Sequence, residues 1–153
     1  MIKFRRAMKE DREELIRLIQ IADNRNEEVA RKKVIKYMQS DKGFFILATK
    51  SDRIIAYLLF VVIEEDEHAS EFFDISNYSC VCWVAVHPDF RNDGIGSKLL
   101  SETLSQAEHY NKKGLWLDCR KSVLGFYGKN GFVQAGKYLK KGKISYVLLK
   151  EFE

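Results

Sequence analysis

The stretch from Trp83 to Leu100 has the residue types and spacing of a phosphate-binding element. An apolar start is followed by a loop that contains Arg91, Gly94 and Gly96, and then by a segment with helical periodicity. The first amide groups of a helix lack intrahelical partners and lie at the positive end of its dipole, so they favour an anion. Glycine lets the backbone approach a ligand closely, and arginine supplies a charged fork. We therefore predict a pyrophosphate site at Arg91–Ser97.

Three alternatives to a pyrophosphate site can be compared for this stretch, and the residues exclude the second of them. The Gly94-x-Gly96 spacing is part of a dinucleotide-binding motif but lacks its third glycine, although Asp118 follows roughly where a ribose-binding acid is expected. A Walker A motif would require an earlier glycine and a hydroxyl residue after Lys98, where the chain has Leu99. The third alternative is a turn between a strand and a helix that binds no ligand.

The elements that would position this stretch follow from the hydrophobic pattern. Strands are expected at residues 2–5, 44–49, 54–63, 81–86, 115–117, from 132 onward and at 144–152, and helices after Asp11 and across residues 30–38, 96–110 and 122–130. Asp11 and Glu14 have the spacing of an N-terminal capping box, and residues 50–53 are predicted to form a four-residue hairpin loop. The order predicts an α+β fold with a mixed, mostly antiparallel sheet of about seven strands and about four helices. With no repeat or linker, residues 1–153 are expected to form a single domain.

The composition excludes several classes of protein. With 46% hydrophobic and 31% charged residues, the chain is typical of a folded globular protein. A formal net charge of +4 is too small to indicate a nucleic-acid partner. The longest apolar run, residues 54–63, is far shorter than the roughly 20 residues that a membrane-spanning helix needs. Because no signal peptide is visible either, we expect a cytoplasmic protein without membrane contact.

The three cysteines are expected to be reduced thiols rather than disulfides or metal ligands. Cys80, Cys82 and Cys119 are odd in number and lie in apolar, strand-like runs. Cys80-x-Cys82 also lacks the wider spacing and the second ligand pair of a structural zinc site. No metal is therefore expected.

The residues around the predicted phosphate site resemble the GNAT family of N-acetyltransferases. The signature Arg/Gln-x-x-Gly-x-Gly/Ala matches Arg91-Asn92-Asp93-Gly94-Ile95-Gly96, which follows an apolar strand and His87-Pro88-Asp89. A second block, Phe126-Tyr127 followed by Gly131-Phe132, also matches in register. The resemblance extends to the order of elements over the whole of residues 1–153.

The resemblance implies that acetyl-CoA binds in a splay between the strands ending at Val86 and Cys119. Its pantetheine arm would pair with the first of these strands, and a backbone N–H near Val84 would stabilise the oxyanion. Tyr127 would be catalytic, as the acid that protonates the departing thiolate. The acceptor would be a primary amine of a small molecule or peptide. The residues implied to bind the cofactor are Trp83, Val84, Ala85, Val86, Arg91, Asn92, Asp93, Gly94, Ile95, Gly96, Ser97 and Phe126.

The chain departs from the family pattern at two positions. Arg120 stands where many relatives have an asparagine seven residues before the tyrosine, and Ser79-Cys80 stands where some have a glutamate base. The general base is therefore open, and the candidates besides a water chain are Glu64, Glu65, His68, Asp74 and Asp118. These departures leave a non-catalytic acyl-CoA-binding module as the alternative function.

Neither the charge of the acceptor nor the oligomeric state follows from the sequence. The acidic run Glu64–Glu67 favours a cationic acceptor, whereas the basic cluster between Lys137 and Lys143 favours an anionic one. A homodimer is among the oligomeric states that the sequence allows.

Overall fold

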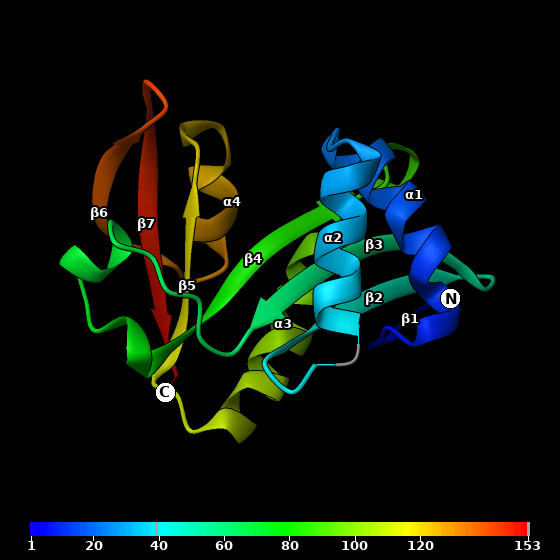
Figure 1. The fold of residues 1–153 in the computed structure, drawn as a ribbon, viewed down its shortest axis with the longest axis horizontal. Coiled ribbons are helices and arrows are strands. Elements are labelled where there is room, and N and C mark those ends of the chain that lie inside the picture. Colours follow the sequence, from blue (N-terminus) through cyan, green and yellow to red (C-terminus); the bar gives the residue numbers. More distant parts are fainter. Residues whose placement is uncertain (39, 153) are drawn as a thin grey trace. The chain divides into compact units, whose positions relative to one another are not determined.

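The computed structural model describes residues 1–38 and 40–152. Within these residues the strands form one seven-stranded sheet in the order β1-β2-β3-β4-β5-β7-β6 (Figure 1). The strands are β1 (Ile2–Arg6), β2 (Gly43–Lys50), β3 (Arg53–Val61), β4 (Tyr78–Val86), β5 (Gly114–Cys119), β6 (Val133–Lys140) and β7 (Lys143–Glu151). The helices are α1 (Arg12–Asp23), α2 (Glu27–Met38), α3 (Ile95–Ala107) and α4 (Leu124–Lys129). The predicted α+β fold, with its mostly antiparallel sheet, is confirmed.

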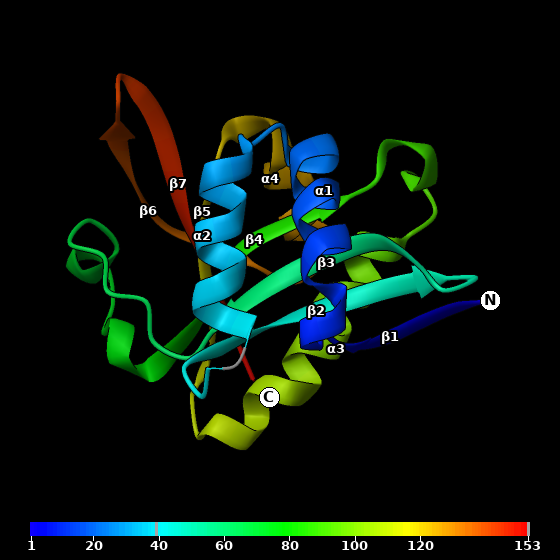
Figure 2. The same cartoon turned by 45° about the vertical axis from the view of Figure 1, so that its right-hand side comes forward.

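The chain divides into two compact units, and β4 contributes to both. The first unit comprises Met1–Phe60 and Trp83–Thr103, and the second comprises Val61–Cys82 and Leu104–Glu153. In the first unit, β1 pairs antiparallel with β2, and α1 and α2 lie side by side over one face of the strands (Figures 1 and 2). The fully buried residues of this unit include Leu15 and Ile19 of α1, Val34 of α2, Leu47 of β2 and Leu58 of β3.

The predicted capping box at the start of α1 is wrong, because both of its side chains bond elsewhere. The Asp11 carboxylate accepts two hydrogen bonds from the Arg5 guanidinium, at 2.7 and 2.8 Å, and one from the Met8 N–H. These bonds lower the pKa of Asp11 below its usual value, mainly through Arg5. The Glu14 carboxylate accepts from the Ile54 N–H at 2.7 Å. The two acids thus attach the helix to β1 and β3 instead of capping it.

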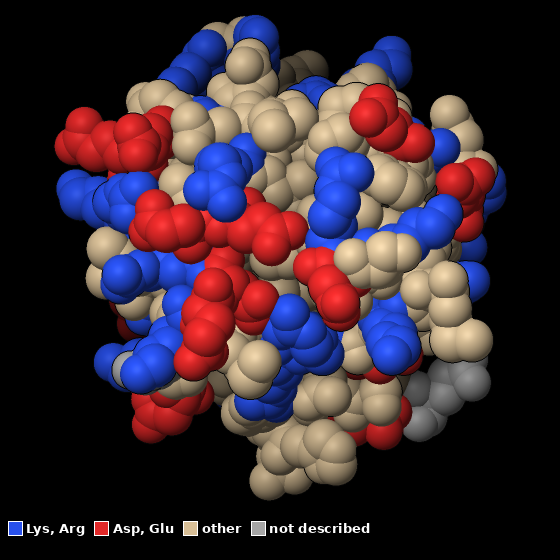
Figure 3. Space-filling model, turned by 90° about the vertical axis from the view of Figure 1, so that its right-hand side faces the viewer, with Lys and Arg blue, Asp and Glu red and all other residues tan. Residues whose placement is uncertain are grey.

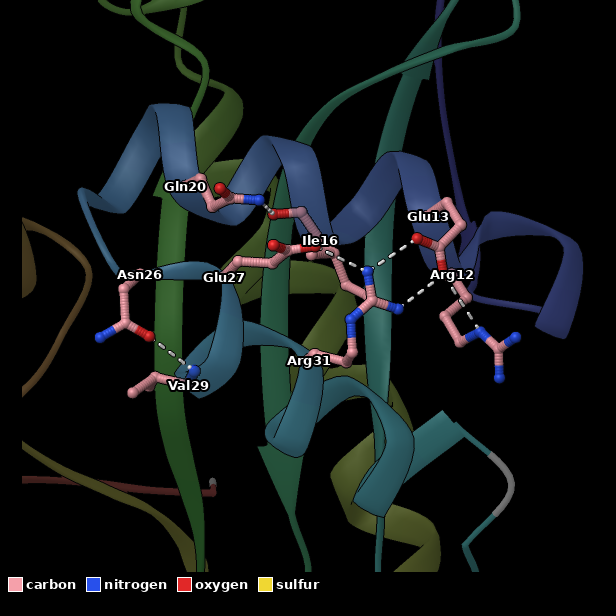
Figure 4. Close-up of polar contacts among 8 residues, drawn as sticks. All are labelled: Arg12, Glu13, Ile16, Gln20, Asn26, Glu27, Val29 and Arg31. Carbon is pink, nitrogen blue, oxygen red and sulfur yellow. Dashed lines mark hydrogen bonds and ion pairs between the residues drawn. The ribbon is translucent and has the colours of Figure 1, made fainter.

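Polar contacts also join α1 to α2 (Figure 4). Arg31 of α2 donates to both carboxylate oxygens of Glu13 in α1, each at 2.9 Å, and to Glu27 one turn earlier at 3.0 Å. The Asn26 side chain accepts from the Val29 N–H at 2.8 Å and so caps α2. Because these side chains are exposed, they orient the helices more than they stabilise them.

The loop between β2 and β3 has two residues rather than the predicted four. β2 ends at Lys50 and β3 begins at Arg53, and the intervening Ser51 and Asp52 have φ values of 50° and 63°. Positive φ at both central residues is the geometry of a type I′ turn, whose twist matches the twist of the strands. Its sequence lacks the glycine that usually indicates such a turn.

In the second unit, β5 pairs with β7 and β7 with β6, both antiparallel. The start of β4 pairs with β5 in the parallel sense, from Tyr78–Gly114 to Cys80–Trp116. β4 therefore begins three residues before the predicted start at Val81. The β6–β7 register shifts between Gln134 and Gly136, where the Phe72 ring lies directly against the glycine. Phe72 belongs to the connection between β3 and β4, which contains two short 3-10 turns, Ala69–Glu71 and Ile75–Asn77.

The face of the molecule in Figure 3 carries Lys and Arg side chains interspersed with Asp and Glu. This mixture agrees with the small formal charge of +4. None of the described helices is long and apolar enough to cross a membrane.

The close packing of β5 on β7 predicts a large effect of a single methyl group. A Cβ on Gly114 would overlap the Lys150 carbonyl oxygen, which is backbone and cannot rotate away. We expect Gly114→Ala to destabilise the protein by about 1–3 kcal/mol, seen as a fall of several degrees in Tm. Gly128→Ala is the matched control, because nothing lies within 4 Å of a Cβ there. In a helix this change stabilises by up to about 1 kcal/mol. Equal Tm values for the two variants would contradict the packing described.

Candidate active site

The loop that joins β4 to α3, residues 87–94, is held at its start by backbone and imidazole bonds. The His87 N–H donates to the Ile55 carbonyl at 2.8 Å, and its Nδ1 accepts from the Asp89 N–H at 3.1 Å. Because Nδ1 accepts a bond, the ring proton of the neutral imidazole lies on Nε2. His87 thus shapes the 3-10 turn Pro88–Phe90.

Arg91 braces the loop with its side chain. Its Nε donates to the Val86 carbonyl at 3.0 Å, and its Nη2 donates to the Ala22 carbonyl in the last turn of α1 at 2.9 Å. The sequence predicted that this guanidinium would bind a phosphate. In the structure, two of its donor nitrogens are bonded to backbone carbonyls, so the backbone amides of the loop are the principal donors left for an anion.

Those amides are gathered at the start of α3. The first helical bond runs from the Lys98 N–H to the Gly94 carbonyl at 3.1 Å, so the N–H groups of residues 94–97 precede the ladder. Gly94 has φ +75° and nothing within 4 Å of a built Cβ, which leaves the approach to the amides open. Asn92 also has a positive φ, 70°. Ile95 anchors the helix start in the core at 2% exposure.

The C-terminal half of β4 leads into this loop, and its residues 83–86 are half-buried. The Trp83 side chain stands on the side of α1 and α2, where the Arg25 guanidinium lies 3.8 Å and the Lys33 ammonium 5.4 Å from its ring centroid. In the second unit, the parallel pairing of β4 with β5 extends from Tyr78–Gly114 to Cys80–Trp116, although β5 continues to Cys119. The backbone of β4 after Cys80 is thus outside that ladder.

Tyr127 and Phe126 lie in α4, in the second unit. Tyr127 is buried, at 7% exposure, whereas Phe126 is half-buried. The tyrosine, and not the phenylalanine, is therefore the residue of the pair that packs in the core. The Tyr127 ring contacts the Phe126 and Phe132 rings edge-on at 5.1 and 5.6 Å. These contacts pack the Tyr127 ring against both neighbouring rings. Arg120, in the position where relatives have asparagine, donates to the Ser122 hydroxyl at 2.9 Å.

The five candidate bases fall into different environments. Asp74 accepts from the Ser76 hydroxyl at 2.6 Å and from Asn77, and the bonds from Ser76 lower the pKa of Asp74. It therefore caps a turn and is a poor base. Glu64 is half-buried and accepts from the Cys82 thiol at 3.7 Å, whereas Glu65 is exposed.

His68 and Asp118 meet on one residue that the sequence analysis did not single out, Tyr138 of β6. The Tyr138 hydroxyl donates to Asp118 at 2.5 Å, and the His68 ring stacks on the phenol ring with centroids 4.3 Å apart. Lys140 lies 3.5 Å from the same carboxylate. Burial and the bond to Asp118 raise the pKa of Tyr138 above its usual value, so the phenol keeps its proton. No local pattern links Tyr138 to Asp118, since their contact arises from the β5-β7-β6 order.

All three cysteines are free. Burial raises the pKa of Cys80 well above its usual value and that of Cys119 to about 11, so both thiols are protonated at neutral pH. Among the residues that the structure describes, no three His, Cys, Asp or Glu side chains are grouped as metal ligands.

A surface pocket lies next to the loop in the first unit. It is lined by α1, the start of β3 and His87, through Glu14, Arg17, Leu18, Ile21, Arg53, Ile54 and His87. The pocket leaves no signal in the sequence, because its residues are separated in the chain and form no motif.

Comparison with known proteins places this geometry in a family. Residues 41–134, more than half of the 153-residue chain, match the acetyltransferase (GNAT) domain. The curated glucosamine 6-phosphate N-acetyltransferase of Schizosaccharomyces pombe is 38% identical over 58 residues, which span 38% of this chain and about half, 52%, of that protein.

Solved structures agree in fold. An acetyltransferase of the GNAT family from Streptococcus pneumoniae matches over 100% of both chains with a TM-score of 0.75 and 19% identity. The PaiA N-acetyltransferase of Thermoplasma acidophilum, solved in complex with coenzyme A, matches over 99% of both chains with a TM-score of 0.75 and 17% identity. The strand, loop and helix around Gly94 lie within the matched region, and this chain belongs to the GNAT family of acetyltransferases.

Proposed function

We propose that this protein is an acetyl-CoA-dependent N-acetyltransferase that acts on a primary amine, with residues 1–153 as one acetyltransferase domain. The observation that carries the proposal is the set of free amides at residues 94–97, at the start of α3, in a chain of the GNAT family. A helix N-terminus with open access suits a pyrophosphate, because its amides and dipole both favour negative charge.

The cofactor would extend from this loop along β4. Its pyrophosphate would bind the amides of Arg91–Ser97, and its pantetheine amides would pair with the backbone of Trp83–Val86. The early end of the β4–β5 ladder at Cys80 supports this arrangement, because backbone groups outside a ladder need other partners. A β4 N–H near Val84 would then face the thioester oxygen and stabilise its developing charge.

The reaction would be a direct transfer. The amine nitrogen attacks the thioester carbon, the new C–N bond forms, and the C–S bond breaks to release coenzyme A. The attacking amine gives a proton to a base, and the thiolate takes one from the Tyr127 phenol. Besides a water chain, the candidate bases are Asp118, His68, Glu64 and Glu65, since Asp74 is bonded within a turn.

The acceptor class is open to direct assay. Thiol release should be measured with amino acids, polyamines, aminosugars, aminoglycosides and peptide N-termini. Glucosamine 6-phosphate belongs in this panel because the partial relative from Schizosaccharomyces pombe is named for acetylating it. Acetylation of at least one amine is expected.

A second candidate function is acyl-CoA binding without turnover. It is favoured by Arg120, which bonds Ser122 where many relatives have an asparagine, and by the lack of a glutamate at Ser79-Cys80. Acetyl-CoA binding without thiol release over the whole panel would establish this alternative.

The first prediction concerns the loop. Acetyl-CoA should raise Tm, because a ligand bound by the folded state stabilises it, and NAD should raise it much less. Gly94→Glu should abolish the acetyl-CoA shift by placing negative charge at the amides. Gly142→Glu is the matched control, since Gly142 has φ +78° and the same open surroundings but lies in the β6–β7 turn. If both variants lose the shift, or neither does, the loop is not the phosphate site.

The second prediction concerns Tyr127. Tyr127→Phe removes only the hydroxyl, so turnover should fall by roughly 10²–10⁴-fold while acetyl-CoA affinity stays unchanged. Tyr78→Phe is the control. The Tyr78 hydroxyl donates to Glu151 at 2.6 Å at the start of β4, away from Trp83–Val86, so its removal should affect stability alone. Turnover of Tyr127→Phe within about threefold of the parent protein would contradict the proton-donor role.

A further inference from the structure

Two cations share one tryptophan at the C-terminal half of β4. The Arg25 guanidinium lies 3.8 Å from the Trp83 ring centroid and the Lys33 ammonium lies 5.4 Å from it. Trp83 and Lys33 are half-buried, and 34% of the Arg25 side chain is exposed. The cation pair, Arg25 and Lys33, thus stands at the surface of an aromatic side chain and remains accessible to a small molecule.

The charges around the cation pair do not balance. Arg25 Nε donates to the Asp23 carboxylate at 2.6 Å, and the Tyr57 hydroxyl donates to the same oxygen at 3.1 Å. Lys33 has no hydrogen bond or ion pair among residues 1–38 and 40–152. The two cations at the Trp83 ring therefore have one bonded carboxylate between them, and an anionic ligand would supply the counterion that Lys33 lacks among the described residues.

The segment that carries Arg25 is fixed in place. The α1–α2 corner, Ala22–Arg25, is bonded to the loop through Arg91 and to β3 through Tyr57. Asn24 closes α1 in the left-handed conformation at φ 51°. Because the loop and β3 both hold this corner, Arg25 is preorganised beside Trp83 and a ligand need not order it.

We infer that the cation pair recognises an oxyanion, a phosphate or carboxylate, on the acceptor amine. This inference rests on the proposed function, in which the thioester lies along β4 at Trp83–Val86. Trp83 directs its ring to the side of α1 and α2, so an acceptor that reaches β4 from that side meets Arg25 and Lys33. Arg25 is bonded to Asp23 through Nε and also interacts with the Tyr57 hydroxyl, so its remaining N–H groups offer a charged donor, and Lys33 adds a point charge. The acceptor is then an amine with an anionic group.

The test compares matched amines that differ in one anionic group. The pairs are glucosamine 6-phosphate against glucosamine, and β-alanine against its amide. Binding is followed by the fluorescence of Trp83, with Trp83→Phe as the blank that leaves Trp116, and KM is measured where turnover occurs. We expect at least one anionic member to bind roughly tenfold or more tightly than its neutral partner, and inorganic phosphate to compete with it.

Lys33→Gln should raise Kd and KM for the anionic amine by roughly tenfold, and leave the neutral amine and acetyl-CoA unchanged. Lys32→Gln is the matched control, because Lys32 is exposed on the same helix and should change neither. Equal affinity for both members of each pair, or an equal loss for both in Lys33→Gln, would overturn the inference even if acetyl transfer proceeds. Selective binding of the anionic amine without turnover of any amine would instead uphold the site and contradict the proposed catalysis.

Discussion

The position of the candidate site depends on one guanidinium. Arg91 donates to the Val86 carbonyl at the end of β4 and to the Ala22 carbonyl at the end of α1. The last carbonyls of a helix lack intrahelical partners and carry the negative end of its dipole, so a cation is favoured there. Through the two bonds the loop, the strand and the helix end form one connected set.

Because of these two bonds, the Arg91 side chain and the loop backbone have different roles. With two of its donor nitrogens on carbonyls, Arg91 positions the loop, and the amides of residues 94–97 remain for a ligand. The same contact holds the α1–α2 corner near β4. Tyr57 and Asp23 complete the attachment, and Arg25 then reaches the Trp83 ring. The cation pair is thus a consequence of how α1 is anchored.

Two acids in the second unit, Asp74 and Asp118, have different bonded partners. Asp74 accepts three hydrogen bonds within its own turn. Asp118 of β5 instead accepts a hydrogen bond from Tyr138 of β6, two strands away in the sheet. The raised pKa of Tyr138 keeps the phenol protonated, and it remains a donor that orients the carboxylate. His68 covers the phenol ring from one side. A candidate base is therefore better judged from its bonded partners than from its residue type.

The sequence by itself determined the order of elements, the α+β class and the stretch that resembles the family, because these depend on local periodicity and on contiguous residues. It predicted the strand, loop and helix around Gly94, and the pair Phe126-Tyr127. It failed where a local signal had a distant competitor: Asp11 bonds Arg5, and Glu14 bonds Ile54, so the capping box does not form.

Only the tertiary structure decided which distant side chains meet. Lys33 and Trp83 are fifty residues apart in the chain, and Asp118 and Tyr138 twenty. Strand order and helix placement bring each pair together, and neither leaves a periodic trace in the sequence. Burial likewise distinguished Tyr127 from Phe126, since adjacent residues of a helix point in different directions and packing alone sets which one is enclosed.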